Sequence, residues 1–172
     1  MSSKKLIFLE LENFIIILFG LIPTFFGFIL RSILMKLLLK KNSGFIWVQP
    51  FVIFVHSKNI SIGKNFGINS FCYINGVGGI YIGDNVLIGS HVTISSGKHP
   101  IHDKLTPVYH SKIIPLKITI EDDVWIGSGC VILPGVTIAQ GTVVGANSTV
   151  TKNTKPYSVI YGSPAKESRI RC

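Results

Sequence analysis

The sequence is poor in charged residues, above all in acidic ones. Only 8 of its 172 residues are Asp or Glu, against 17 Lys and Arg, and charged residues make up 15% of the chain. The net charge of +9 leaves three kinds of partner, namely nucleic acid, an anionic membrane surface or a phosphate-rich ligand. No nucleic-acid-binding motif accompanies this charge. We therefore expect a membrane surface or a phosphate-rich ligand, and no nucleic acid.

Cysteine is also scarce. Cys72, Cys130 and Cys172 are too few and too far apart for a disulfide framework or a zinc-binding motif. This suits a reducing compartment such as the cytosol. A chain of 172 residues can bury the core of one domain without covalent crosslinks. Cys72 and Cys130 each follow a regularly spaced isoleucine by four residues, which indicates packing in a core.

What the sequence does have is a repeat of six residues. Between Ile118 and Val150 a branched aliphatic residue recurs at every sixth position, often followed by glycine or alanine. The repeating residues are Ile120, Ile126, Ile132, Ile138, Val144 and Val150. An α-helix would scatter them around its surface, because six residues make about 1.7 turns. A parallel β-helix aligns them in ladders along its core, so the repeat predicts that fold.

The same repeat occurs upstream. Earlier members are Ile62, Ile68, Ile74, Ile82, Ile88 and Ile94, with a shift of two residues between the third and the fourth. The shift falls at Gly78 and Gly79, which predicts a bulged corner. All runs together make twelve hexapeptides, or four coils of three strands, preceded by an irregular coil in Phe45 to Val55. We expect residues 45–155 to form the β-helix domain.

Residues 1–44 precede this domain as an apolar helical segment and a linker. Asn13 to Leu30 is a run of eighteen residues without a charge. As a helix it would measure about 27 Å, against roughly 30 Å for the hydrocarbon core of a bilayer. Pro23 lies in its middle and favours two short helices that meet there. Cations flank both ends of the run, which is compatible with a hairpin that enters and leaves on the cytosolic side.

The pattern becomes amphipathic after this run. Ser32, Lys36 and Lys40 are four residues apart, on one face of a helix that is otherwise rich in leucine. Such a helix suits a membrane interface. We expect the protein to associate with the cytoplasmic side of the membrane. The alternative is a helical cap that packs on the β-helix or between subunits.

The repeat is interrupted between Ile94 and Ile120, where 20 residues are added. The added segment is the loop 97–117, and it carries three of the five histidines, His99, His102 and His110. Long loops on a regular scaffold are usually functional or disordered, and we expect an ordered, functional one. After the repeat, residues 156–172 are expected to cap the open end of the stack, with a short helix that begins at Ser163 and Pro164.

Three motifs occur in order along the chain: GKHPIH at 97–102, VWIGSG at 124–129 and YGSPAK at 161–166. Together with the repeat they resemble the hexapeptide-repeat O-acetyltransferases, most closely the galactoside and maltose branch. The apolar N-terminal segment is more like that of relatives that O-acetylate colanic acid, O-antigen and capsule sugars. The resemblance covers about residues 60–169. It implies an all-β, left-handed parallel β-helix, a homotrimer with an active site between two subunits, acetyl-CoA as co-substrate and no metal.

The resemblance also implies roles for single residues. His99 matches the catalytic general base, and imidazole suits the removal of a hydroxyl proton near neutral pH. The backbone N–H of Ser128 would stabilise the oxyanion. Asn69 and His102 would bind the acceptor, although a corner asparagine with left-handed backbone angles is the structural alternative for Asn69. Coenzyme A would be bound by Trp125, Ser128, Ala146, Thr151, Lys152, Lys166 and Arg169, with the cations on its phosphates.

We therefore expect an acetyl-CoA-dependent O-acetyltransferase that modifies a sugar hydroxyl of a cell-surface glycan or its lipid-linked precursor by direct transfer. The acidic residues that follow the acceptor asparagine in the galactoside branch are absent, with Gly76 and Val77 in their place. This argues against free galactosides or maltose as acceptors. The alternatives are a soluble acetyltransferase for a sugar or antibiotic, a non-catalytic trimer, and a γ-carbonic-anhydrase-like trimer with zinc held by histidines across the interface. The last would need a triad at suitable spacing, which His91, His99 and His102 do not clearly give.

Overall fold

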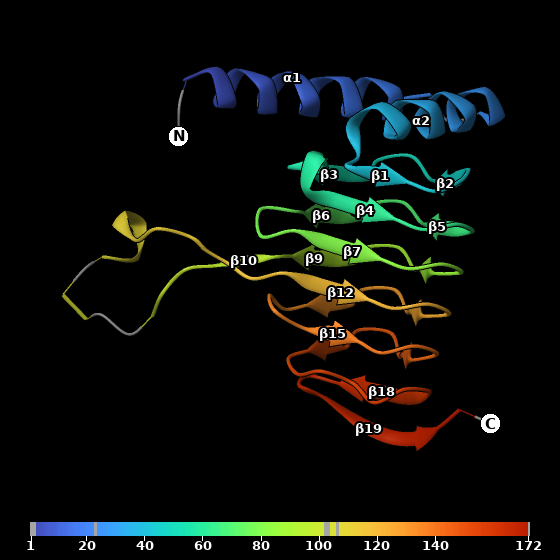
Figure 1. The fold of residues 1–172 in the computed structure, drawn as a ribbon, viewed down its shortest axis with the longest axis vertical. Helices are drawn as coiled ribbons and strands as arrows, with labels where there is room; N and C mark the ends of the chain where they lie inside the picture. Colours follow the sequence, from blue (N-terminus) through green and yellow to red (C-terminus); the bar gives the residue numbers. More distant parts are fainter. Residues whose placement is uncertain (1–2, 23, 102–103, 106, 172) are drawn as a thin grey trace.

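The computed structural model describes residues 3–22, 24–101, 104–105 and 107–171. Two helices, α1 (Ser3–Gly20) and α2 (Phe25–Leu38), lie across one end of a stack of β-coils and are called the cap here (Figure 1). The chain descends through the stack from the cap to the C-terminal strands at the other end. The long loop leaves the stack at one side.

Three sheets form the walls of the stack, and through β17 the strands of the coils enter sheets A, B and C in turn. All neighbouring strands in these sheets are parallel except β19, the last strand of sheet B. Sheet A contains β1 (Lys41–Asn42), β4 (Ile60–Ile62), β7 (Ile80–Ile82), β12 (Ile118–Ile120) and β15 (Thr137–Ile138). Sheet B contains β2 (Ile46–Val48), β5 (Phe66–Ile68), β8 (Leu87–Ile88), β13 (Trp125–Ile126), β16 (Val143–Val144), β18 (Ser158–Gly162) and β19 (Ala165–Ile170). Sheet C contains β3 (Ile53–Val55), β6 (Tyr73–Asn75), β9 (Thr93–Ser95), β14 (Val131–Ile132) and β17 (Thr149–Val150).

The aliphatic repeat forms the core of the stack. In sheet A, the aligned partners are Ile62, Ile82, Ile120 and Ile138, and each is at most 2% exposed. Each strand ends at a corner, so the next inward position comes six residues later on the next wall. The predicted parallel β-helix is therefore confirmed, with its four regular coils β4–β6, β7–β9, β12–β14 and β15–β17.

The coils begin slightly earlier than the repeat suggests, because Lys41 and Asn42 pair with Ser61 and Ile62. A short 3-10 turn, η1 (Ser57–Asn59), fills the corner between the first and second coils. The two-residue shift in the repeat also lies at a corner. There Gly79 adopts a φ of 90° and its N–H donates to the carbonyl of Gly76 at 2.9 Å.

The C-terminal segment is a β-hairpin, so the predicted final helix is wrong. β18 pairs in parallel with β16, and β19 pairs antiparallel with β18. The last coil leaves an edge of unpaired backbone groups, which a further strand satisfies and a helix does not. Ser163 and Pro164 therefore lie in the hairpin turn, next to Gly162 with its φ of 103°.

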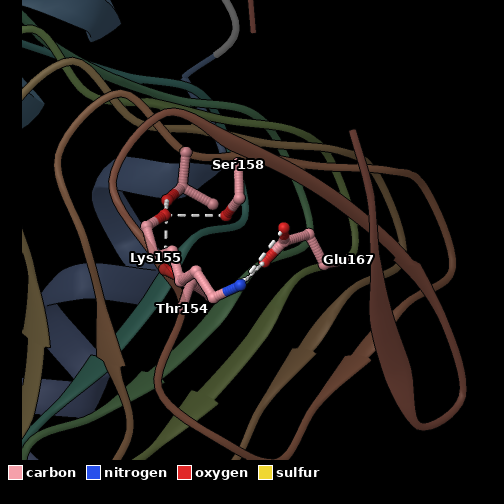
Figure 2. Close-up of polar contacts among 5 residues, drawn as sticks. Thr154, Lys155, Ser158 and Glu167 are labelled. Carbon is pink, nitrogen blue, oxygen red and sulfur yellow. Dashed lines mark hydrogen bonds and ion pairs between the residues drawn. The ribbon is translucent and has the colours of Figure 1, made fainter. Parts of the chain in front are cut away.

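Side-chain contacts fix this hairpin to the last coil (Figure 2). The Lys155 carbonyl accepts hydrogen bonds from Ser158 Oγ at 2.8 Å and from Thr142 Oγ1 at 3.3 Å. Lys155 Nζ lies 3.1 Å from Glu167 Oε2 on β19. The ion pair is exposed and contributes at most about 1 kcal/mol. It adds a side-chain contact to β19, the strand that carries Lys166 and Arg169 and that pairs with β18.

At the other end, Arg31 joins both helices to the first coil. Its side chain is 5% exposed. Nε donates to the Val48 carbonyl at 2.9 Å, and Nη1 donates to the carbonyls of Phe19 at 3.1 Å and Ile22 at 2.7 Å. Phe19 lies in the last turn of α1 and Ile22 lies two residues beyond its end, where the carbonyls of a helix attract a cation. Burial lowers the pKa of this guanidinium from its ordinary value.

The cap differs in part from the sequence prediction. The chain breaks between Gly20 and Phe25, as two short helices require, although Pro23 itself lies outside the described residues. The predicted polar face is wrong, because Ser32 is 1% exposed and its Oγ accepts a 3.4 Å hydrogen bond from the Ile46 N–H. The first coil has an open edge, and Ser32 satisfies one of its donors. Lys40 lies beyond the end of α2.

Membrane crossing by a single helix requires both length and apolar character. None of the helices in the described part of the chain combines the two.

Candidate active site

The histidine loop leaves the stack as a two-stranded ribbon. β10 (Gly97–Lys98) and β11 (Ile114–Pro115) pair antiparallel, and the residues between them reach away from the coils (Figure 1). Ser96 fixes the base of the ribbon, because its Oγ accepts from the Gly78 N–H at 2.8 Å and its carbonyl accepts from the Leu116 N–H at 2.7 Å. A 3-10 turn, η2 (Val108–His110), lies farther out.

His99 follows β10 directly and its side chain is exposed. Its Nδ1 lies 3.1 Å from Oγ of Ser111, which follows η2. The Ser111 hydroxyl donates its proton to the Val108 carbonyl at 2.6 Å. A hydroxyl has a single proton, so Ser111 Oγ must accept from His99. The contact therefore places the proton of a neutral imidazole on Nδ1 and leaves the lone pair on Nε2, as a general base requires.

The predicted acceptor residues are Asn69 and His102, and the second lies outside the described residues. Asn69 follows β5 at the B–C corner, by which we mean the turns that lead from sheet B to sheet C. Its N–H donates to the Ile88 carbonyl at 3.0 Å and its side chain is exposed. Left-handed corner positions are taken by other asparagines, among them Asn85 and Asn147, both at φ 58°. Backbone conformation therefore does not account for an asparagine at position 69.

Ser128 lies at the same B–C corner, two coils farther from the cap than Asn69. Its Oγ accepts a 3.3 Å hydrogen bond from Ser90 Oγ, and its carbonyl accepts from the Asn147 N–H at 2.8 Å. Among the residues that the structure describes, none accepts the backbone N–H of Ser128. A free N–H on a rigid corner is the kind of donor that stabilises an oxyanion.

Trp125 lies on the outer face of sheet B and is 56% exposed. It borders a groove of about 560 Å³ that extends over Leu87, Val143 and Val159 to two arginines of the C-terminal segment, Arg169 and Arg171. Arg171 Nη1 pairs with Asp123 Oδ2 at 2.9 Å. Arg169 has no carboxylate partner in the described part of the chain. The ring of Trp125 and the unpaired guanidinium of Arg169 therefore line the same groove.

The remaining predicted cofactor residues lie at two places. Ala146 is at the B–C corner, one coil beyond Ser128, and Lys166 follows the hairpin turn close to it. That turn is attached to the corner, because the Gly162 N–H donates to Ser148 Oγ at 3.1 Å. Thr151 and Lys152 lie elsewhere, at the C–A corner, by which we mean the turns from sheet C to sheet A.

One chain does not bring all the predicted residues together. The loop of His99 leaves from the C–A corner, after β9 and on the same side as Thr151 and Lys152. Asn69 and Ser128 lie at the B–C corner, and a strand of sheet C separates the two corners in every coil. In Figure 1 the loop projects from the side of the stack opposite to β5. His99 and Asn69 are therefore on different edges of the protomer.

Sequence reasoning missed the apolar outer face of sheet B. Its outward positions are mostly apolar, whereas those of sheet A include serine and threonine. The aligned residues on sheet B are Trp47, Gly67, Leu87, Trp125, Val143 and Val159. The first, third and fourth of these are 49–59% exposed. Contiguous apolar surface of this kind marks an interaction site, and the residue before each core aliphatic was the signal in the sequence.

A second groove, of about 420 Å³, lies on the same face close to the cap. It is lined by Phe45, Trp47, Gly67, Asn69 and Leu87 among others. A side chain at Gly67 would meet Leu87 Cδ2 at 2.9 Å, so the glycine keeps this groove open. Phe45 and Trp47 form an aromatic wall of this groove. The wall continues into the cap, because the ring centroid of Phe28 on α2 lies 4.0 Å from that of Trp47.

Neither metal nor thiol chemistry has support in the described residues. Among them, no group of three or more His, Cys, Asp or Glu side chains could hold a metal ion. His91, one of the three histidines considered for a zinc site, stacks on Phe71 with ring centroids 5.1 Å apart. Cys72 and Cys130 are buried in the core, where desolvation raises the pKa of both thiols. Their position agrees with core packing.

Known proteins resemble this chain in sequence. The family model for the bacterial transferase hexapeptide (six repeats) matches residues 117–152. The galactoside O-acetyltransferase of Escherichia coli (strain K12) is 44% identical over 123 residues, a match that covers 72% of this chain and 60% of the relative. The chain therefore spans about three fifths of the length of that curated relative.

Solved structures resemble it over a longer stretch. A galactoside acetyltransferase in complex with coenzyme A superposes with a TM-score of 0.84 at 35% identity, covering 94% of this chain and 82% of the other. A maltose O-acetyltransferase from Clostridium difficile 630 gives a TM-score of 0.82 at 27% identity, covering 99% and 89%. These likenesses agree with the left-handed sense expected for the coils.

Proposed function

Because the chain belongs to the hexapeptide-repeat acetyltransferase family, we propose that it transfers the acetyl group of acetyl-CoA to a hydroxyl of a sugar. The observation that carries this proposal is the hydrogen-bond chain from His99 through Ser111 to Val108, which favours the tautomer of a neutral imidazole that has its lone pair on Nε2. No covalent acyl-enzyme is needed, since the base lets the sugar hydroxyl attack the thioester directly.

The chemistry follows from the proposed roles. The sugar oxygen forms a bond to the thioester carbon while its proton moves to Nε2 of His99. The carbonyl oxygen becomes an oxyanion, for which the free N–H of Ser128 is the donor. The tetrahedral intermediate then breaks its C–S bond, and the departing thiolate takes the proton from the imidazolium. The products are the acetylated sugar and free coenzyme A.

The co-substrate has a plausible path along the B–C corner and sheet B. Ser128 and Ala146 are stacked one coil apart and would line an extended pantetheine arm. Trp125 offers an aromatic surface beside that arm. Lys166 and Arg169 come from the C-terminal hairpin and would meet the phosphates by charge-assisted hydrogen bonds. Thr151 and Lys152, at the other corner, could contribute only from a neighbouring subunit.

We further propose a homotrimer whose active sites lie between subunits. Two observations support it: the separation of His99 from Asn69 within one chain, and the apolar outer face of sheet B. Packing the C–A corner of one protomer against sheet B of the next would bury that face. It would also bring the base of one chain to the acceptor asparagine and cofactor groove of another.

For the acceptor we propose a sugar of a cell-surface glycan or of its lipid-linked precursor, modified on the cytoplasmic side of the membrane where acetyl-CoA is available. Asn69 supplies an amide to orient a hydroxyl, and the groove beside it has an aromatic wall formed by Phe45 and Trp47. A soluble galactoside is the second candidate, since a relative at 44% identity is a galactoside O-acetyltransferase.

The first test is calorimetric titration of the full-length protein with acetyl-CoA. Micromolar binding that weakens in Lys166→Ala/Arg169→Ala supports the donor assignment. The matched control is Lys36→Ala/Lys40→Ala, which removes two exposed lysines at the end of the stack opposite the C-terminal hairpin. Absence of binding at millimolar ligand would refute the acetyltransferase proposal.

The second test asks whether sites are shared. His99→Ala and Asn69→Ala chains, each inactive alone, are mixed by co-expression and assayed for coenzyme A release with a panel of galactosides and glycan precursors. In random mixed trimers, a site is intact when an Asn69→Ala chain supplies His99 and the neighbouring His99→Ala chain supplies Asn69. About a quarter of the sites meet this condition, so about a quarter of wild-type activity should return. No recovery, with mixed trimers verified by mass, would show that both residues act within one chain or not at all.

A further inference from the structure

The cap presents a large apolar surface on the side that faces away from the coils. Ten described large apolar side chains of the cap and of the turn between its helices are at least 49% exposed, among them Phe14 at 64%, Phe26 at 64% and Leu37 at 76%. Side chains of this size expose on the order of 1,000 Å² in total. Soluble monomers rarely leave more than a few hundred Å² of contiguous apolar surface unpaired.

The exposed residues of α1 follow one face of the helix. Glu12, Ile16 and Gly20 are buried against the coils at spacings of four. The opposite face carries Ile7, Leu11, Phe14, Leu18 and Leu21, at spacings of three and four. Spacings of this kind place side chains in a single stripe. The stripe of α1 that faces away from the coils is therefore apolar and exposed.

α2 repeats this arrangement. Arg31, Ser32 and Met35 face the coils, and the opposite side carries Phe26, Ile33 and Leu37, which are exposed. Both helices lie across the end of the stack and present their sides outwards (Figure 1). The two apolar stripes therefore belong to one end surface of the molecule.

The charges around this surface favour an anionic partner. Glu12 is turned inwards, where it is 3% exposed and its Oε1 accepts a 3.0 Å hydrogen bond from the Ser57 N–H. Among the cap side chains that the structure describes, Glu10 is the one exposed carboxylate. Lys36, Lys40 and Lys41 are exposed at the edge of the cap. An apolar surface bordered by lysines matches the interface of a bilayer that contains anionic lipid.

We infer that the outer surface of the cap binds a phospholipid bilayer, with α1 and α2 lying in the plane of its interface and the coil stack projecting from it. Arg31 makes this arrangement firm, because it ties the C-terminal end of α1 and the first coil to α2. The stripes then enter the acyl region while the lysines meet lipid phosphates. This surface is separate from the proposed transfer site.

The test is flotation of the full-length protein with vesicles of phosphatidylcholine and phosphatidylglycerol. Wild-type protein should float with them and bind pure phosphatidylcholine more weakly. Phe14→Ser/Leu37→Ser removes one anchor from each helix and should weaken binding about a hundredfold, since each buried anchor is worth roughly a factor of ten. The matched control, Ile101→Ser/Tyr109→Ser, removes equally exposed apolar side chains from the loop and should bind as wild type.

Two results would overturn the inference. The first is wild-type protein that does not float, and the second is Phe14→Ser/Leu37→Ser protein that floats equally well. If wild-type protein does not float but forms a larger assembly that this variant does not form, the cap binds a second copy instead. Circular dichroism and thermal melting of the same variant show that it is folded, whichever proposal holds. Acetyl-CoA titration then keeps failure of lipid binding distinct from failure of the acetyltransferase proposal.

Discussion

Replacing Ser111 by alanine tests the assignment of the imidazole protons in His99. The contact is an exposed bond of 3.1 Å between neutral groups, so in the resting enzyme it contributes about 1 kcal/mol. When Nε2 takes the substrate proton, the donor becomes a cation, and charge-assisted bonds are roughly twice as strong. Only the difference, about 1 kcal/mol, lowers the barrier. We therefore expect kcat to fall about fivefold in Ser111→Ala.

The fivefold fall in kcat expected for Ser111→Ala is compared with the larger fall expected for His99→Gln. Loss of the base should lower kcat by about 10²- to 10⁴-fold. Both variants are assayed by release of coenzyme A, at saturating concentrations of both substrates, with the acceptor that the panel identifies. Ser111→Thr retains a hydroxyl and should recover most of the activity.

Two outcomes would refute the reasoning. Unchanged kcat in Ser111→Ala, beside an inactive His99→Gln, would mean that the hydrogen bond does not position the imidazole. A change in KM alone would assign Ser111 to acceptor binding.

Three further predictions concern the scaffold. Arg31→Met removes three hydrogen bonds to backbone carbonyls and should lower the free energy of unfolding in urea by about 3 kcal/mol. The control, Lys36→Met on the exposed side of α2, should change it by less than about 0.5 kcal/mol. Equal effects of the two substitutions would contradict the role of Arg31. Gly129→Ala places a side chain at φ 72° and against an asparagine amide, so thermal melting should show a loss of about 2 kcal/mol. Burial raises the pKa of the Cys72 and Cys130 thiols, so little thiolate exists at neutral pH. In a variant whose C-terminal cysteine is replaced by serine, neither thiol should react with a thiol reagent until urea unfolds the chain. Rapid labelling of the native protein would contradict this.

The regular part of the fold was predictable because its information is local and repeated. Ile120 and Ile138 are in register through a period that any one coil displays. The final hairpin was not predictable in this way. Ser163 and Pro164 carry a local signal for a helix start, and the need to pair the open edge of β16 outweighed it. Ser32 was misjudged for a similar reason, since its partner belongs to another element.

The candidate site was predictable in part, through motifs rather than geometry. GKHPIH drew attention to His99, but its partner Ser111 lies 12 residues later in a loop without a period. No sequence pattern connects two residues across such a loop. The separation of His99 from Asn69 was likewise invisible, because it depends on which corner of a three-sided coil each residue occupies.

Because the cap lies at one end of the stack, the coil in which a residue lies sets its distance from the cap. Adjacent parallel strands lie about 4.8 Å apart, so each coil adds that height above the cap. Asn69 follows β5 in the second coil and Ser128 follows β13 in the fourth. They therefore stand about 5 and 14 Å beyond the first coil. With the cap in a membrane interface, the spacing of the coils would fix the distance between the membrane and the site at which a tethered sugar is acetylated. Hydroxyls nearer to or farther from the lipid would not reach that site.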